Sequence, residues 1–335
     1  MTVSSLALLL AVGLAAAGSA EELHKSFSGI TAVELSTVSG DVVIKTHGSS
    51  EVLVDVVYEV EPEGAVEFEF DESGKRLVIK ESWQSKIRRP VRSDVEWTLT
   101  VPADIEIEFS TASGDITASG LTGRIDAGTA SGNIDLRDMN CDVDLSTASG
   151  DIMLVNLQGD MDLSTASGDI VVENVKGDVE LSTASGDITA AGLSGVVDLS
   201  AASGDIEISG SKGAFDINCA SGDITAKDLV IAGESEFSAA SGDIEITLAE
   251  TSGFDLDLNS ASGDILLDYS GNEVRGFFEF TASKRHGRIV CPFGFDSEEE
   301  YEQGGETNLR KSFSKGGDTP RIELTTASGK AELKK

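Results

Sequence analysis

Short runs of alternating apolar and polar residues, separated by turn residues, recur along most of the chain. The stretch from Val179 to Gly195 is typical, with one alternating run before the sequence Ala-Ser-Gly-Asp and another after it. A period of two is typical of β-strands with one buried face, and Gly, Ser and Asp favour turns. Each unit therefore predicts a strand, a turn, a second strand and a second turn.

The dipeptide Ser-Gly marks the repeat. Two further copies, Ser241 and Ser262, follow the regular series at intervals of 20 and 21 residues. A fixed short period indicates stacked repeats rather than several globular domains. Successive serines of the regular series are 18 residues apart: Ser113, Ser131, Ser149, Ser167, Ser185, Ser203 and Ser221.

Equivalent positions of successive units carry the same kind of side chain. One position before the turn is always apolar, as in Val143 and Val179, and an acid follows it, as in Asp144 and Glu180. Alternation predicts that the apolar residues face a shared core and the acids face solvent. The position after the turn is isoleucine throughout: Ile116, Ile134, Ile152, Ile170, Ile188, Ile206, Ile224, Ile244 and Ile265.

The pattern predicts an all-β fold, a single-stranded β-solenoid (β-helix) built of rungs of about 18 residues. One rung buries too few aliphatic side chains to offset its conformational entropy, so the rungs must stack. The usual chirality of parallel crossovers predicts a right-handed coil, although this coil length also fits left-handed hexapeptide helices.

The predicted organisation has four parts. Residues 1–20 form a signal peptide, 21–106 a first rung with inserted β-hairpins as an N-terminal cap, and 107–270 the regular rungs. Residues 271–335 hold degenerate rungs, a flexible acidic and glycine-rich loop at 296–319, and a terminal rung from Arg321 to Leu333. The caps are needed because exposed strand edges otherwise pair with other chains.

The signal peptide is inferred from the apolar run Leu6–Ala17, which is too short to span a bilayer, and from the small residues that follow it. Cleavage is expected after Ala20. The mature protein is therefore expected to be exported to the periplasm or the cell surface, with no transmembrane segment. No disulfide is expected between Cys141 and Cys219, because four rungs separate them.

The formal net charge of −34 excludes two partner classes. Nucleic acids and anionic lipids would be repelled rather than bound. Cations and basic surfaces remain as partners, and high like charge also keeps a long stack soluble.

A second acidic column follows the Ser-Gly turns and allows two interpretations. Its carboxylates accept backbone N–H groups at the turns, or they hold Ca²⁺ between rungs through hard oxygen ligands. The nonapeptide of calcium-loaded β-rolls is absent, which weighs against dedicated calcium sites. Asn133 interrupts the column, whose acidic members are Asp115, Asp151, Asp169, Asp187, Asp205, Asp223, Asp243 and Asp264.

Catalysis needs groups that converge at one place, and a residue repeated in every rung does not define a single site. His24, His47 and His286 are isolated and lack metal-type spacing. The sequence therefore predicts no catalytic residue, no cofactor and no enzyme; a polysaccharide-active β-helix enzyme is the remote alternative. A threonine ladder that begins at Thr111 is assigned to packing rather than to ice binding.

One basic segment lies between Trp83 and Trp97. It is interpreted either as a cap loop against the acidic stack or as a contact for an anionic envelope polymer or protein. Its bases are Lys86, Arg88, Arg89 and Arg92.

These motifs resemble a bacterial family of β-strand repeats named for adhesins and largely regarded as a domain of unknown function. The resemblance covers roughly residues 27–333: the Ser-Gly-Asp-Ile turns, the strand-rich insertion ending at Val101-Pro102, and the closing Ile322–Gly329. It implies a β-solenoid on an exported or envelope-associated protein, and it brings no catalytic residues. We therefore expect a non-enzymatic structural or binding scaffold of the bacterial envelope, whose partner is an envelope or surface protein or polysaccharide. The alternative is a Ca²⁺-binding repeat module.

Overall fold

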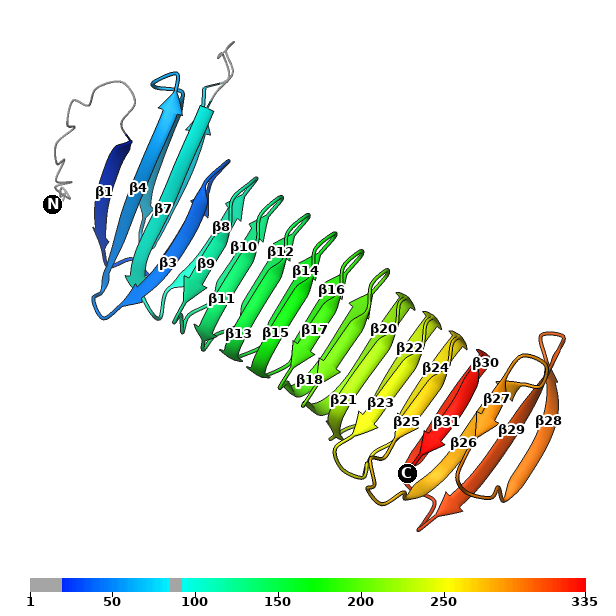
Figure 1. Ribbon diagram of the computed structural model, residues 1–335. Helices are drawn as coiled ribbons and strands as arrows, with labels where there is room; N and C mark the ends of the chain where they lie inside the picture. Colours follow the sequence, from blue (N-terminus) through cyan, green and yellow to red (C-terminus); the bar gives the residue numbers. More distant parts are fainter. Residues whose placement is uncertain (1–19, 85–91) are drawn as a thin grey trace.

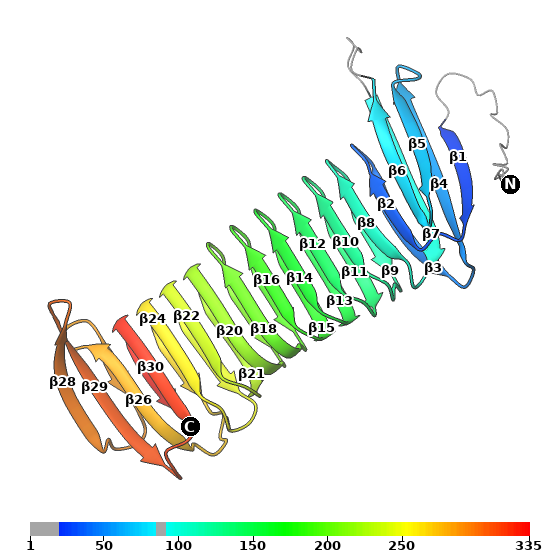
Figure 2. The same cartoon turned by 180° about the vertical axis from the view of Figure 1, so that it is seen from behind.

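The protein is an all-β molecule of 31 strands in the residues that the computed structural model describes, 20–84 and 92–335. These residues contain no helix, and so none that could cross a membrane. The strands form an elongated stack of parallel coils, and antiparallel strands are added at each end (Figures 1 and 2).

Each regular coil contributes a first strand and a second strand, on opposite sides of the Ser-Gly-Asp turn. The first strands are β8 (Glu106–Thr111), β10 (Ile125–Thr129), β12 (Val143–Thr147), β14 (Met161–Thr165), β16 (Val179–Thr183), β18 (Ser194–Ala201), β20 (Lys212–Ser221), β22 (Ser235–Ser241) and β24 (Leu256–Ser262). The second strands are β9 (Ile116–Ser119), β11 (Ile134–Met139), β13 (Ile152–Gln158), β15 (Ile170–Lys176), β17 (Ile188–Ala191), β19 (Ile206–Ser209), β21 (Ile224–Ile231), β23 (Ile244–Leu248) and β25 (Ile265–Asp268).

Successive coils pair in parallel, so that each residue lies beside its equivalent in the next repeat. Ile152 pairs with Ile170, and Ile170 pairs with Ile188. All three side chains are fully buried in one continuous core that extends along the whole stack. Alternation thus places like apolar side chains in continuous buried files. The handedness of the coil stays a prediction.

At the N-terminal end the first coil, β2 (Ala32–Ser36) and β3 (Asp41–His47), pairs in register with β8 and β9. The insertion between this coil and β8 forms four strands: β4 (Glu51–Glu61), β5 (Val66–Ser73), β6 (Arg76–Trp83) and β7 (Arg92–Pro102). β5 and β6 form the predicted hairpin, and β6 and β7 continue the parallel stack beyond β2 and β3. Antiparallel to β7 lies β4, followed by β1 (Glu21–Ser28).

The C-terminal end differs from the expectation in two respects. The last coil of the chain, β30 (Arg321–Ser328) and β31 (Lys330–Lys334), is not at the end of the stack. It lies between β24–β25 and the strands β26 (Gly276–Ser283) and β27 (Arg288–Val290) (Figure 1). The segment expected as a flexible loop is instead the antiparallel pair β28 (Ser297–Gln303) and β29 (Glu306–Lys315), with β29 paired to β26.

The β28–β29 hairpin forms because one of its faces packs on the core. The side chain of Phe313 on β29 is buried and stacks on Phe278 with ring centroids 4.8 Å apart. Lys311 and Arg310 of β29 form ion pairs with Glu298 and Glu299 of β28. The many charges of this segment suggested a solvated loop, but they pair with one another within a hairpin, and Phe313, on the same face as Lys311, packs on the core.

Candidate functional site: an outward file of carboxylates

The first strands carry an unbroken line of acidic side chains on their outer face, which we call the acid file. Backbone pairing places each member beside the next, from the first coil to β26. At ~4.8 Å per step the file is about 53 Å long. In spatial order it consists of Glu34, Glu108, Asp126, Asp144, Asp162, Glu180, Asp198, Asp216, Glu236, Asp257, Glu323 and Glu279.

The equivalent outward line on the second strands has no such uniformity. It includes methionine, valine, leucine, threonine and acids in the same kind of exposed strand position. Folding therefore does not require an acid at an outward strand position. Its members are Thr117, Asp135, Met153, Val171, Thr189, Glu207, Thr225, Glu245 and Leu266.

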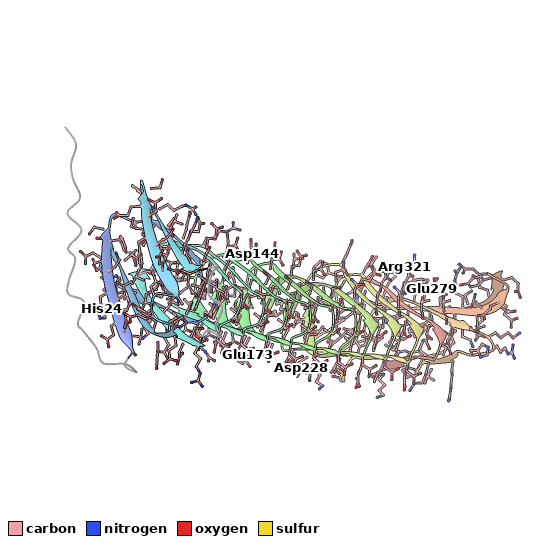
Figure 3. All side chains as sticks on the ribbon, turned by 90° about the horizontal axis from the view of Figure 1, so that it is seen from above. His24, Asp144, Glu173, Asp228, Glu279 and Arg321 are labelled. Atoms are coloured by element: carbon pink, nitrogen blue, oxygen red, sulfur yellow. The ribbon has the colours of Figure 1, made fainter. Side chains whose placement is uncertain are left out.

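Arginines neutralise the two ends of the acid file. Arg76 lies 3.5 Å from Glu34 and 3.1 Å from Glu108. At the other end Arg321 pairs with Glu323 and lies 3.5 Å from Glu279, as Figure 3 shows for the latter pair. Within the described residues, no member from Asp126 to Asp257 forms an ion pair. The centre of the file is therefore a line of negative charge without ion-pair partners, and Arg124 acts on Asp126 without forming an ion pair with it.

Burial and mutual repulsion raise the pKa of several carboxyls in this central part. For Asp126 and Asp198 partial burial is the larger cause, and the charge of neighbouring file members adds to it. For Asp257 burial is again the largest cause of the raised pKa. Glu323 and Glu236 raise the pKa further, and Arg321 opposes them. Unit charges ~5 Å apart repel by roughly 0.8 kcal/mol in water and ~3 kcal/mol at an effective dielectric constant of 20. A bound cationic group would relieve this repulsion.

A shallow groove with a volume of about 1460 Å³ runs along the first strands beside the acid file. Its lining consists of the small residues that precede the Ser-Gly turns, such as Ser146, Thr147 and Ala148. Ser146 lies two positions beyond Asp144 on the same outer face, about 7 Å along the strand. The groove and the acid file thus form one extended surface.

Three hydroxyls of the threonine ladder, those of Thr147, Thr165 and Thr183, donate to carbonyl oxygens of the turns. Thr147 Oγ1 donates a hydrogen bond to the carbonyl oxygen of Gly132 at 3.2 Å, and Thr165 makes the same bond to Gly150. Both side chains are buried. This contact supports the assignment of the ladder to packing.

The second acidic column, after the Ser-Gly turns, forms a hydrogen-bonded ladder between coils. The backbone N–H of Asp187 donates to Asp169 Oδ1 at 2.9 Å, and Asp205 N–H donates in turn to Asp187 at 2.8 Å. Asn133 belongs to the ladder without a break, because its Oδ1 accepts the N–H of Asp151 at 3.0 Å. One oxygen of each side chain satisfies a backbone donor that the tight turn leaves unpaired. The same bond begins at Asp41, which accepts the N–H of Asp115, and recurs at Asp115, Asp151, Asp205, Asp223, Asp243 and Asp264.

Asp169→Asn should leave stability almost unchanged, whereas Asp169→Ala should cost about 1–3 kcal/mol, because alanine leaves the N–H of Asp187 without its acceptor. Urea unfolding of both variants measures the difference. Equal losses would show that the carboxylate charge, rather than the acceptor oxygen, is what the ladder needs.

Calcium binding by this column stays a prediction. No group of three or more His, Cys, Asp or Glu side chains in residues 20–84 and 92–335 has an arrangement suited to a metal ion. Millimolar Ca²⁺ should raise the melting temperature of the wild type above the value in matched Mg²⁺ if the column binds it.

Three members of the predicted basic contact, Lys86, Arg88 and Arg89, lie outside the described residues. Arg92 begins β7, opposite Glu61 of β4, and its side chain is exposed. Partner contact through this segment stays a prediction.

The fold and the acid file define an all-β repeat protein with a long acidic face. Residues 30–194 and 179–287 match the Toastrack DUF4097 family, and the chain belongs to that family. Among curated proteins, none matches the chain.

Several solved structures are similar to it at low sequence identity. A putative adhesin from Parabacteroides distasonis ATCC 8503 is 12% identical, with 95% of this chain and 98% of that chain covered and a TM-score of 0.42. A putative lipid binding protein from the same organism is 14% identical, with 94% and 97% covered and a TM-score of 0.33. A putative cell adhesion protein from Clostridium sporogenes ATCC 15579 is 10% identical, with 94% and 99% covered and a TM-score of 0.21.

Proposed function

We propose that this protein is a non-enzymatic β-solenoid scaffold, exported to the periplasm or cell surface, that binds an extended cationic partner along its acid file. The partner is an envelope or surface component, a protein or polysaccharide, that carries several positive charges in a line. One observation carries the proposal: twelve outward positions of the first strands are all acidic, although the matching positions of the second strands are mixed.

The charge distribution supports a partner that lies along the stack axis. Arg76 and Arg321 neutralise the ends, so the attractive field is concentrated on the central coils. Uniform spacing between coils suits a partner whose charges repeat along its length. Electrostatic complementarity of this kind contributes to the association rate and is weakened by salt.

Neutralising the centre of the file should weaken such binding by roughly 3- to 150-fold at low ionic strength, because three charge pairs of roughly 0.2–1 kcal/mol each are lost. The variant is Asp144→Asn, Asp162→Asn and Glu180→Gln together. The probe is an immobilised extended oligolysine peptide, with affinity measured by surface plasmon resonance at two salt concentrations.

The matched control removes three acids from other positions: Glu173→Gln, Asp228→Asn and Glu245→Gln. Figure 3 shows Asp144 on the opposite side of the stack from Glu173 and Asp228, and Glu245 belongs to the second strands. Both variants change the net charge equally. Equal loss of binding would mean that only total charge attracts the peptide, and the proposal would be wrong.

A further inference from the structure

Buried polar atoms without partners gather at one corner of the first coil. They are Thr37 Oγ1, Ser39 Oγ, Glu81 Oε2 and Trp97 Nε1. In three regular coils the threonine at this position, Thr147, Thr165 or Thr183, donates to a glycine carbonyl of the preceding coil, whereas Thr129 Oγ1 is unpaired as well. The first coil instead has β6 and β7 as its neighbours on that side, and neither provides the usual turn.

The pairing register places Glu81 at the threonine position of this outer layer. β6 pairs in parallel with β2 so that Ile79 lies beside Leu35. Glu81 follows Ile79 by two residues, as Thr37 follows Leu35, and therefore points toward the same interior. Its side chain is only 7% exposed. A carboxyl group thus occupies a site where the other coils have a small hydroxyl group or a similarly small side chain.

Two aromatic residues adjoin Glu81, Trp83 and Phe68, and the second tryptophan, Trp97, packs on Phe68. Trp83 Nε1 donates a hydrogen bond to Glu81 Oε1. Phe68 lies opposite Glu81 across the β5–β6 hairpin, and its ring meets Trp97 edge-on with centroids 5.2 Å apart. Glu81 is therefore enclosed by weakly polar groups.

The charged groups of the adjoining strands point elsewhere. On β2, Glu34 lies on the outer face beside Arg76, and on β3 Asp41 accepts the N–H of Asp115. On β5, Glu69 lies on the outer face and accepts the hydroxyl of Ser82, and Glu67 alternates to that same face. On β7, Glu96 is exposed while its neighbours Val95 and Trp97 are buried. On β6 itself, Lys80 is exposed.

We propose that Glu81 makes the N-terminal end of the stack a pH-sensitive latch, closed when this side chain is protonated and loosened when it is ionised. In the protonated form, its O–H is available to donate to one of the unpaired hydroxyls at the corner. In the ionised form, a carboxylate in a dry corner favours entry of water, and the β5–β6 hairpin that carries it is held less firmly.

The direction of the pH dependence follows from burial. Burial raises the pKa of Glu81, while the Trp83 indole and the backbone of Val38 and Ser39 oppose the shift. An acid with a raised pKa in the folded state contributes stability at low pH. That contribution is lost as pH rises through the raised pKa.

Intrinsic fluorescence tests the latch directly, because Trp83 and Trp97 are the only tryptophans and both adjoin the corner. Wild-type emission should change between about pH 4 and pH 8, around a midpoint above that of an ordinary glutamate. Glu81→Gln should abolish this change. It should also melt about 2–4 °C higher than the wild type at the upper end of the range and at the same temperature at the lower end.

Two further variants keep the test decisive. Glu81→Thr restores the residue found at this position in regular coils, and should also be insensitive to pH if the glutamine variant folds poorly. Glu67→Gln, on the outer face of β5, should retain the wild-type profile. Identical fluorescence and melting profiles for the wild type and both Glu81 variants would overturn the proposal.

Discussion

Gly168→Ala should destabilise the protein by at least about 3 kcal/mol, the upper end of the usual cost of overpacking. A Cβ atom at Gly168 would lie 1.8 Å from the carbonyl oxygen of Gly150 and 2.5 Å from its carbonyl carbon. Both atoms belong to backbone, so no side-chain rotation relieves the overlap. The two coils must separate at this corner, and the hydrogen bonds beside it lengthen.

Gly253→Ala is the matched control. Nothing lies within 4 Å of a Cβ atom built at Gly253. The free energy of unfolding, measured in urea, should therefore change little for this variant. If the two substitutions cost the same, close approach between coils is not the reason for glycine in the Ser-Gly turns.

This close approach between coils explains why the repeated turns contain glycine. The repeat of Ser-Gly at 18-residue intervals predicted turns, and turn propensity alone permits Asn or Asp at such a position. The structure shows a stricter requirement, because equivalent glycines from Gly132 to Gly263 each place their Cα against the carbonyl of the preceding coil. Contact between coils selects glycine along this line, and at Gly114 and Gly204 positive φ values of 142° and 157° add a conformational requirement.

A different corner has the conformational requirement. Asp138, Asn156, Asn174 and Asp228 have φ values between 54° and 61°, and Gly192 occupies the same line with φ 66°. Only glycine, asparagine and aspartate adopt this region readily. Asn174 Nδ2 donates to Asn156 Oδ1 at 3.1 Å, and so the side chains also connect the coils. This restricted choice of Asp, Asn or Gly at 18-residue intervals is a signal in the sequence for a second line of tight turns.

The ends of the stack were harder to predict than its middle. Within the repeats, each residue's neighbour is its equivalent 18 positions away, so periodicity alone predicts contacts. At the ends the contacts join unlike segments: Glu81 lies against the turn at Val38–Ser39, and the last coil enters between β24 and β26. Nothing in the periodicity of Arg321–Leu333 distinguishes an end coil from an inserted one.

The acid file was visible in the sequence only in part. Alternation identified the outward acids from Glu108 to Glu236. The pairing adds Glu34 at one end and Asp257, Glu323 and Glu279 at the other, which belong to irregular spacings. The neutralising roles of Arg76 and Arg321 depend on strands far apart in sequence, and for that reason the spacing of residues gave no indication of them.

Ile170→Ala should cost about 2–5 kcal/mol in the free energy of unfolding, because it opens a cavity at a fully buried position between Ile152 and Ile188. Val196→Ala is the control, since the Val196 side chain is 56% exposed, and it should cost much less. Equilibrium urea unfolding measures both.

Double substitutions test the stack itself. Ile170→Ala combined with Ile188→Ala should deviate from additivity by about 0.5–3 kcal/mol, because the two cavities adjoin. Ile170→Ala combined with Ile265→Ala should be additive within about 0.5 kcal/mol, because five coil spacings, ~24 Å, separate them. In a stack each coil contacts only its neighbours, so coupling must vanish with distance along the axis. Strong coupling of the distant pair, or none between the adjacent pair, would contradict the buried file on which both the fold and the alignment of the acid file depend.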